Sequence, residues 1–166
     1  MGFRGIGQGL ELLGGLCRSL LRRPGLASGA VLSQSGAIPY RHVDGEVVFL
    51  IITSRATGTW IFPKGGLMDG LSPTESAAQE AYEEAGVRGD IETTPAGSYH
   101  TVKTRFGIEL LASVQMYPLE VVEQLDDWPE KGDRQRCWVT LDEARRRISD
   151  PALVTLAETV AGNVSD

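Results

Sequence analysis

Hydrophobic and polar residues alternate in short runs from about residue 27 onward, a pattern typical of β-strands. Residues 30–32 and 37–40 predict two short strands separated by a turn at Gly36. The Asp44–Gly45 pair favours a tight hairpin turn, and the apolar run 47–52 follows it as the returning strand. Further strands are expected at residues 59–62, where Pro63 ends the run, and at residues 91–103, 108–117 and 136–139.

Residues 72–86 carry the clearest helical pattern of the chain. Ser72 is a favourable N-cap, Pro73 suits the first helical position, and Glu75 completes a capping box. Gly86 favours termination of the helix. One face of the predicted helix is apolar and consists of Ala77, Ala78, Ala81 and Ala85.

Two shorter helices are expected nearer the C-terminus. Residues 140–143 repeat the capping pattern, and Pro151 favours the start of a last helix that ends near Gly162. Strands and helices are mixed without strict alternation along the chain. We therefore expect an α+β fold in which a mixed β-sheet is packed between helices.

Residues 1–25 differ in composition from the rest of the chain, and Pro24–Gly25 separates the two parts. Leucines recur at helical spacing between residues 10 and 21, and the arginines mostly follow them. A secretory signal would place its basic residues ahead of the apolar stretch. We expect a leader or amphipathic helix over residues 1–25, with an organellar transit segment as the alternative, and one domain over residues 26–166.

Length and composition fit a single globular domain: of 166 residues, 42% are hydrophobic and 23% are charged. The net charge of −6 argues against a nucleic-acid or membrane partner, because such proteins usually carry an excess of basic residues. Cys17 and Cys137 are isolated, which argues against a zinc site and is typical of reduced thiols in a cytoplasmic protein. The oligomeric state is left open.

Three glutamates of the predicted helix, Glu80, Glu83 and Glu84, lie at spacings i, i+3 and i+4 and share one stripe of its surface. Like charges at this spacing repel, and carboxylates in the last turns face the negative end of the helix dipole. A divalent cation removes both costs, and clustered carboxylates with water are the ligands that Mg²⁺ or Mn²⁺ prefers. A solvated acidic surface is the alternative for these residues taken alone.

The loop before this helix favours the metal-site interpretation. Residues 62–66 (FPKGG) form a glycine-containing loop, in which the backbone can approach a ligand closely. Loop and helix together resemble the Nudix box, whose pattern is Gly, five residues, Glu, seven residues, then Arg-Glu-apolar-x-Glu-Glu-x-Gly-apolar. The positions that match in register without a gap are Gly65, Glu80, Ala81, Glu83, Glu84, Gly86 and Val87.

Two positions depart from the family pattern. Leu71 stands in place of its first Glu, and Gln79 stands in place of its Arg, which in the family helps to orient the adjacent glutamate. Gln79 retains the capacity to hydrogen-bond a neighbouring carboxylate but supplies no charge. Because both members of the usual charged pair are replaced, we interpret the departures as an exchanged supporting interaction around retained metal ligands.

The resemblance implies a hydrolase that uses Mg²⁺ or Mn²⁺ to cleave a phosphoanhydride bond. Glu80 and Glu84 are the implied metal ligands. Glu83 is a further ligand or the general base that acts on the attacking water. The backbone carbonyl at Lys64 or Gly65 would complete one metal site. Family members often recruit another carboxylate from a later loop, for which the candidates are Glu120 and Glu123.

Phosphate groups require cationic partners. The first candidates for substrate binding are Lys64, Arg55, Lys103 and Arg105, and weaker candidates are Arg41, Lys131, Arg134 and Arg136. The candidates for stacking on a base are Tyr40, Trp60 and Trp138, although aromatic residues in strands more often belong to the core. His42 and His100 show neither metal-site nor triad spacing.

The expected substrate is a small phosphorylated molecule: a nucleoside diphosphate derivative, a dinucleoside polyphosphate or a diphosphoinositol. The FPKGG loop and the basic residues resemble the diphosphoinositol and diadenosine polyphosphate branch of the family. The alternative is a Nudix-fold module that binds a ligand or regulates, with little turnover. A helical interaction protein with an acidic face is a third hypothesis, and it leaves the register of the whole box unexplained.

Overall fold

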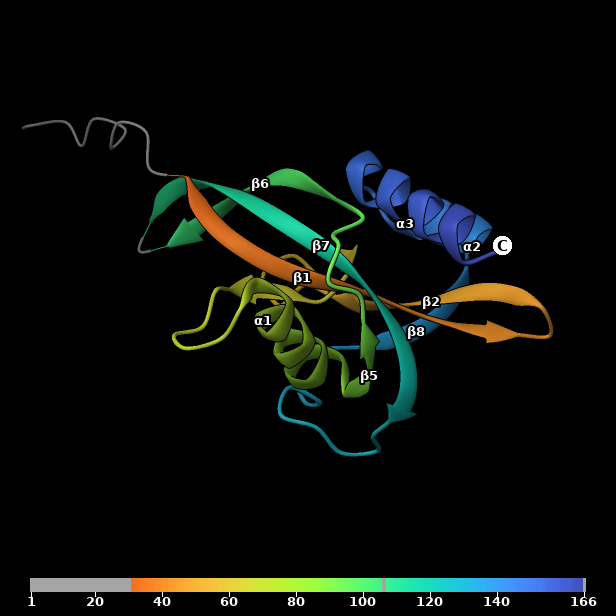
Figure 1. Cartoon of the computed structure of the whole chain (residues 1–166). Helices are drawn as coiled ribbons and strands as arrows, with labels where there is room; N and C mark the ends of the chain where they lie inside the picture. Colours follow the sequence, from red (N-terminus) through yellow and green to blue (C-terminus); the bar gives the residue numbers. More distant parts are fainter. Residues whose placement is uncertain (1–30, 106, 166) are drawn as a thin grey trace, which may run out of the picture.

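The computed structural model describes residues 31–105 and 107–165 (Figure 1). The expected leader over residues 1–25 and Cys17 lie outside these described residues. The strands are β1 Leu32–Val43, β2 Glu46–Thr53, β3 Trp60–Ile61, β4 Lys64–Gly66, β5 Val87–Ile91, β6 Gly97–Arg105, β7 Ile108–Gln124 and β8 Arg136–Thr140. The helices are α1 Pro73–Glu80, which continues as the π-helical turn η1 Ala81–Ala85, α2 Leu141–Arg147 and α3 Pro151–Val164. Among the described helices, none is long and apolar enough to cross a membrane.

The strands form one mixed eight-stranded sheet with the central order β3-β2-β1-β7-β5. Strands β1 and β7 run parallel, with Leu32 opposite Ala112 and Tyr40 opposite Glu120, and the other pairs of the described chain run antiparallel. The short strand β4 pairs with β1, β6 pairs with β7, and β8 pairs with β2. The parallel central pair therefore brings the early strands beside the long strand that follows the Nudix box.

Helices cover both faces of the sheet (Figure 1). Successive strand residues point to opposite sides, so apolar residues of the same strands form a core on each face. Ile38 and Phe49 pack on one face with α2 and α3, in a core that also contains Val114, Met116 and Leu153. Ala37 and Leu50 pack on the other face against the alanines of α1 and η1. The expected fold class, a mixed sheet packed between helices, is confirmed.

Local sequence signals set several element boundaries as expected. Asp44 and Gly45 both have positive φ (52° and 80°), as a tight hairpin between β1 and β2 requires. Ser72 accepts a hydrogen bond from Glu75 N and donates its own N–H to the Glu75 carboxylate, which completes the capping box. Thr140 and Glu143 form the second box, at the start of α2.

The expected turn at Gly36 is wrong, because β1 continues unbroken through this residue. Gly36 instead allows close packing: a β-carbon there would lie 2.7 Å from Met116 Sδ and 2.7 Å from the Pro63 carbonyl. The missing side chain therefore lets β4 and the preceding loop lie against β1. Gly36 therefore marks a close approach between neighbouring segments and not a reversal of the chain.

The expected strands at residues 91–103 and 108–117 also need correction. The first region is two strands, β5 and β6, and β7 continues past Pro118 to Gln124. Pro118 lies where the partner of β7 changes from β6 to β5, and its carbonyl accepts Glu92 N–H at 2.9 Å. Between the two pairings, the missing proline N–H removes no hydrogen bond to β5 or β6, so the strand tolerates the residue.

The helix expected at residues 72–86 is confirmed in extent but not in geometry. Its last turn, Ala81–Ala85, is π-helical, and it ends at Gly86, which has a left-handed φ of 65°. A π turn holds more residues than an α turn, and such turns are frequent at functional sites. The three box glutamates therefore do not follow the regular spacing assumed from the sequence.

Candidate active site

Strand β4 places the glycine of the loop directly against the helix. Gly65 pairs with Ser35 of β1, whose hydroxyl in turn donates to the Pro73 carbonyl at the start of α1 (2.5 Å). The α-carbon of Gly65 lies so close to Glu80 that a β-carbon would overlap the Glu80 carboxylate. Only glycine fits this position, which gives a physical reason for the first residue of the Nudix box.

Glu80 lies in surroundings that disfavour its negative charge. Burial raises the pKa of the Glu80 carboxyl to about 7, and three neighbouring carboxylates add to this effect: Glu84, Glu83 and Glu130. The charged form therefore needs a nearby cation to be stable near neutral pH. A divalent cation beside Gly65 would satisfy that need.

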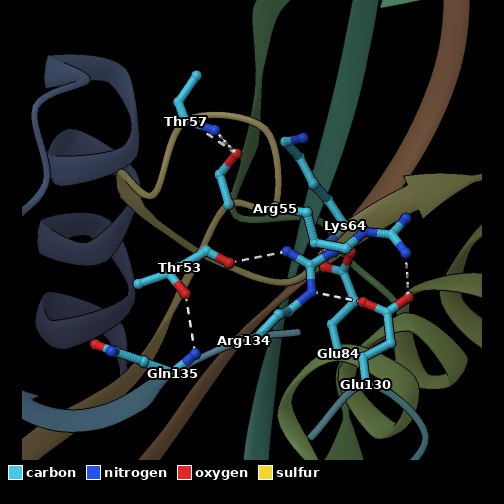
Figure 2. A network of polar contacts seen from close by, with 9 residues as sticks. Thr53, Arg55, Thr57, Lys64, Glu84, Glu130, Arg134 and Gln135 are labelled. Carbon is cyan, nitrogen blue, oxygen red and sulfur yellow. Dashed lines mark hydrogen bonds and ion pairs between the residues drawn. The ribbon is translucent and has the colours of Figure 1, made fainter. Parts of the chain in front are cut away.

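Glu84 is almost fully buried, with an exposed fraction of 6%. Its Oε2 accepts the backbone N–H of Lys64 at 2.9 Å, and its Oε1 forms an ion pair with Arg134 (Figure 2). Burial raises the pKa of Glu84, while the Lys64 N–H and the Arg134 guanidinium act in the opposite direction. Both oxygens of this implied metal ligand thus have protein partners.

Arg134 connects Glu84 with two other segments of the chain (Figure 2). Its Nε donates to Glu130 Oε2 at 2.6 Å, and its NH1 donates to the Thr53 carbonyl at 2.9 Å. Arg55 lies on the other side of Glu130, with 3.4 Å between the guanidinium and the carboxylate. The end of β2, the helix and the segment before β8 therefore meet in one ionic network.

Glu83 has a different partner from the other two box glutamates. Gln79 donates a hydrogen bond from Nε2 to Glu83 Oε1 at 2.6 Å. The backbone carbonyl of Glu83 also accepts Glu130 N–H at 3.1 Å, which attaches the segment after β7 to the helix. The expectation that Gln79 hydrogen-bonds a neighbouring carboxylate agrees with this contact.

The donor chemistry of the site fits a hard divalent cation, although the cage is not preformed. Within residues 31–105 and 107–165, no three histidine, cysteine, aspartate or glutamate side chains are grouped to hold a metal. Glu83 is instead hydrogen-bonded to Gln79, and Glu84 is paired with Arg134. Glu80 and Glu84 nevertheless provide neighbouring carboxylate oxygens beside Gly65, the donor type that Mg²⁺ and Mn²⁺ prefer.

A cleft of about 460 Å³ opens next to these glutamates. Its lining includes Lys64, Lys103, Arg55 and Arg134, so three of the four first candidates for phosphate binding line the same cleft as Glu84. Burial lowers the pKa of Lys64, and the Glu84 carboxylate partly offsets this effect. The side chain of the fourth candidate, Arg105, lies outside the described part of the structure.

The remaining cationic and aromatic candidates have structural contacts. Arg41 stacks on Trp138, and Lys131 pairs with Asp127. Arg136 stacks on Trp128 at 3.8 Å and donates to the carbonyls of Ala85, Gly86 and Leu125. It therefore supplies, from β8, the positive charge that the last turn of the helix lacks. Of the aromatic candidates Tyr40, Trp60 and Trp138, Trp60 lines the cleft.

The two later carboxylates proposed from the sequence lie in β7 and not in a loop. Glu120 is 3.9 Å from His42, and Glu123 is 3.6 Å from Arg88. The later carboxylate that reaches the site is Glu130, which sequence reasoning missed. Its spacing of four residues from Arg134 was a usable signal, because charged residues at this spacing often pair.

Two cleft residues were also not foreseen. The phenol of Tyr99 is buried, and burial and the Asp150 carboxylate raise its pKa, so it is a neutral hydrogen-bonding group. Asp150 lines the same cleft and caps α3 by accepting Ala152 N–H at 2.9 Å. The lining of the cleft therefore combines cationic groups with the neutral phenol of Tyr99 and with the Asp150 carboxylate at the start of α3.

Comparison with known proteins gives a family match over most of the chain. The family model of the NUDIX domain matches residues 35–158. Nudix hydrolase 16, mitochondrial, of Arabidopsis thaliana is 38% identical over 131 residues, which cover 70% of this chain and 72% of that protein. Nudix hydrolase 12, mitochondrial, of the same plant is 36% identical over 127 residues, which cover 66% of this chain and 63% of that protein. The chain thus spans less than two thirds of the length of the latter relative.

More distant relatives and solved structures agree with this match. Diphosphoinositol polyphosphate phosphohydrolase 2 of Rattus norvegicus is 29% identical over 113 residues, 67% of this chain and 59% of that protein. A binary complex of the C. elegans Ap4A hydrolase has a TM-score of 0.62 at 18% identity, covering 81% of this chain and 98% of that one. The NUDIX domain of Shewanella oneidensis NrtR, complexed with ADP ribose, has a TM-score of 0.65 at 14% identity, covering 82% and 90%. The structural likeness shows the shared fold. The matched domain and the Arabidopsis relatives show that this chain belongs to the Nudix family.

Proposed function

We propose that this chain is a divalent-metal-dependent hydrolase that cleaves a phosphoanhydride bond in a small phosphorylated substrate. The observation that carries the proposal is the contact between Gly65 and the Glu80 carboxylate, beside Glu84 at the edge of a cationic cleft. A carboxylate whose pKa is raised by burial and by like charges has no evident structural benefit. The raised pKa of this carboxylate is explained if the site binds a cation together with an anionic substrate.

Glu80 and Glu84 would hold Mg²⁺ or Mn²⁺, with the Gly65 carbonyl as the expected third protein ligand. The metal would lower the pKa of a bound water and neutralise phosphate charge. Glu83, with one oxygen fixed by Gln79, would act as a further ligand or accept the proton of the attacking water. Lys64 and Lys103 would orient the phosphates from the cleft wall.

The substrate proposed here is a nucleoside diphosphate derivative, a dinucleoside polyphosphate or a diphosphoinositol. These molecules share a phosphoanhydride attached to an organic group. The lining of the cleft has cations for the phosphates and, in Tyr99 and Trp60, neutral aromatic groups that suit the organic part of such a substrate. The names of the rat diphosphoinositol polyphosphate phosphohydrolase and the C. elegans Ap4A hydrolase support the same range.

A substrate panel tests this proposal. Phosphate or nucleotide release is measured with Mg²⁺ and with Mn²⁺ on ADP-ribose, dinucleoside polyphosphates, nucleoside triphosphates and diphosphoinositols, with chelator as a blank. Glu80→Gln is the matched control against a contaminating hydrolase, because it has nearly the same size but removes the implied ligand charge. Metal-dependent release by the natural chain that is lost in Glu80→Gln supports the proposal. Release that is equal in both proteins contradicts it.

The second candidate is a Nudix-fold module that binds such a ligand with little turnover. The ion pair between Arg134 and Glu84 favours it, since it occupies an implied metal ligand. The departures at Leu71 and Gln79 point the same way. Calorimetric binding of a panel compound without metal, together with no release in its presence, would select this candidate.

The cellular location stays a prediction. Its basis is the pair of isolated cysteines, which favours the cytoplasm, with a transit segment over residues 1–25 as the alternative. Two of the plant relatives are named as mitochondrial proteins. Imaging the chain with a fluorescent protein at its C-terminus, with and without residues 1–25, distinguishes the two locations.

A further inference from the structure

Arg134 lies deep in the wall of the cleft, where an unneutralised charge would be costly. The side chains of Arg134 and of its partner Glu84 are only 5% and 8% exposed. The contacts of Glu84 use both oxygens: Lys64 N–H takes Oε2 and Arg134 takes Oε1. A buried ionised carboxylate without a cation would be strongly destabilising, so the charged form of Glu84 needs a positive partner when no metal is bound.

A second carboxylate holds the guanidinium at the same time. Glu130 accepts from Arg134 Nε at 2.6 Å, and the Thr53 carbonyl accepts from NH1 at 2.9 Å. These two contacts do not involve the helix of the box (Figure 2). Loss of the contact with Glu84 would therefore leave Arg134 with two partners at the cleft wall, and it would not leave a buried cation unpaired.

We propose that Arg134 is a built-in counter-ion for Glu84, and that it competes with a divalent cation for Oε1 of this carboxylate. This inference rests on the proposed function, which makes Glu84 a metal ligand. A metal that approaches Oε1 along the lone pair used by the guanidinium must displace it, and the two cations also repel each other. Metal binding at that lone pair therefore requires that Arg134 leaves Oε1.

This competition makes Arg134 a positioning residue with two consequences. It stabilises the metal-free fold and weakens metal affinity, because part of the binding free energy is used to break the ion pair. Once displaced, the guanidinium remains on Glu130 in the lining of the cleft, near Lys64. There it faces the space in which a substrate phosphate would lie, so metal and substrate binding are coupled through one side chain.

The test measures metal affinity and not turnover. Mn²⁺ alone is titrated calorimetrically into the natural chain and into Arg134→Gln, which removes the guanidinium and keeps a polar side chain. We expect the dissociation constant for Mn²⁺ to fall about tenfold or more in Arg134→Gln, within the range typical of coupled equilibria. The melting temperature without metal should fall, and the increase on adding Mn²⁺ should be larger than in the natural chain.

Arg136→Gln is the matched control. It also removes one arginine beside the end of the same helix, but Arg136 contacts backbone carbonyls and Trp128 and not Glu84. Its metal-free stability should fall while its dissociation constant for Mn²⁺ stays that of the natural chain. An equal gain in affinity in both variants would mean a general effect of net charge, and it would overturn the inference.

The other outcomes are also decisive. Equal affinity in the natural chain and Arg134→Gln overturns the competition and leaves the proposed metal site standing. No binding of Mn²⁺ to any of the three proteins overturns the metal site itself, and the competition with it. If Arg134→Gln does not fold, Arg134→Lys takes its place: it retains the charge but loses the planar fork that joins Glu84 to Glu130. Its dissociation constant should then fall at least threefold, and an unchanged value contradicts the inference.

Discussion

Gln79 donates a 2.6 Å hydrogen bond to Glu83, four residues further along the helix. The neutral amide thus takes over the orientation of a box glutamate at the position where the family pattern has an arginine. Leu71, the other departure from the pattern, is 40% exposed. The exposed leucine needs no charged partner, and the amide of Gln79 is hydrogen-bonded to the Glu83 carboxylate. The two departures are therefore compatible with an ordered site.

Glu83→Gln should separate catalysis from folding. We expect turnover on a confirmed substrate to fall about 10²-fold or more, the scale of losing a general base. Metal-free stability should stay level or rise, because the change removes repulsion from Glu80 and an unfavourable contact with the helix dipole. Steady-state kinetics and thermal unfolding with chelator measure the two quantities. Unchanged turnover would mean that Glu83 belongs to a solvated acidic surface and has no part in catalysis. A large loss of stability would mean that its role is structural.

Gly65→Ala should disable the site through steric overlap alone. A β-carbon at residue 65 would displace the Glu80 carboxylate, so we expect weaker Mn²⁺ binding and at least tenfold slower turnover. Overpacking of this kind typically also costs about 1–3 kcal/mol of stability. Gly66→Ala is the matched control in the same strand, since a β-carbon there meets no atom within 4 Å. Equal effects of the two substitutions would show that the Glu80 contact is unimportant.

The raised pKa of Glu80 predicts how the metal-free protein responds to pH. In the folded state Glu80 keeps its proton up to a pKa of about 7, whereas in the unfolded chain it releases the proton near its ordinary pKa of 4.5. Folding is therefore favoured by this group at low pH, and its contribution is lost as pH rises from about 4.5 through 7. Glu80→Gln should show no such loss. As pH rises, the variant should therefore become increasingly more stable than the natural chain. Urea unfolding with chelator from pH 5 to 8 measures this, and a constant difference would contradict it.

Lys103→Met should weaken substrate binding more than it slows the chemical step. Lys103 lines the cleft and lowers the pKa of Lys64, which places its charge near the site. We expect KM to rise about tenfold, the effect of about 1.4 kcal/mol, with kcat changed less than threefold. Arg88→Met is the control, because Arg88 pairs with Glu123 on β5 and β7. A fall in kcat with unchanged KM would instead assign Lys103 to the transition state.

Local chemistry made much of this fold predictable from the sequence. The hairpin at Asp44–Gly45 depends on the φ preferences of two adjacent residues. The capping boxes at Ser72 and Thr140 depend on side chains three residues from their partners. The register of the Nudix box likewise required only spacing along one segment. Each of these signals is complete within a short stretch, so the sequence predicts it without knowledge of the fold.

Local patterns were thus enough to predict the family, the helix of the box and the type of chemistry its glutamates favour. How these glutamates are neutralised depends on contacts that the folded chain creates. Arg134 meets Glu84 across 50 residues, and Arg136 reaches the end of the helix from β8, because the pairing of β8 with β2 brings that strand back to the site. Pro118 and Gly36 misled the prediction for the same reason, since the cost of either residue depends on which strand lies beside it. Burial and charge pairing arise from neighbours distant in the chain, and no local pattern records them.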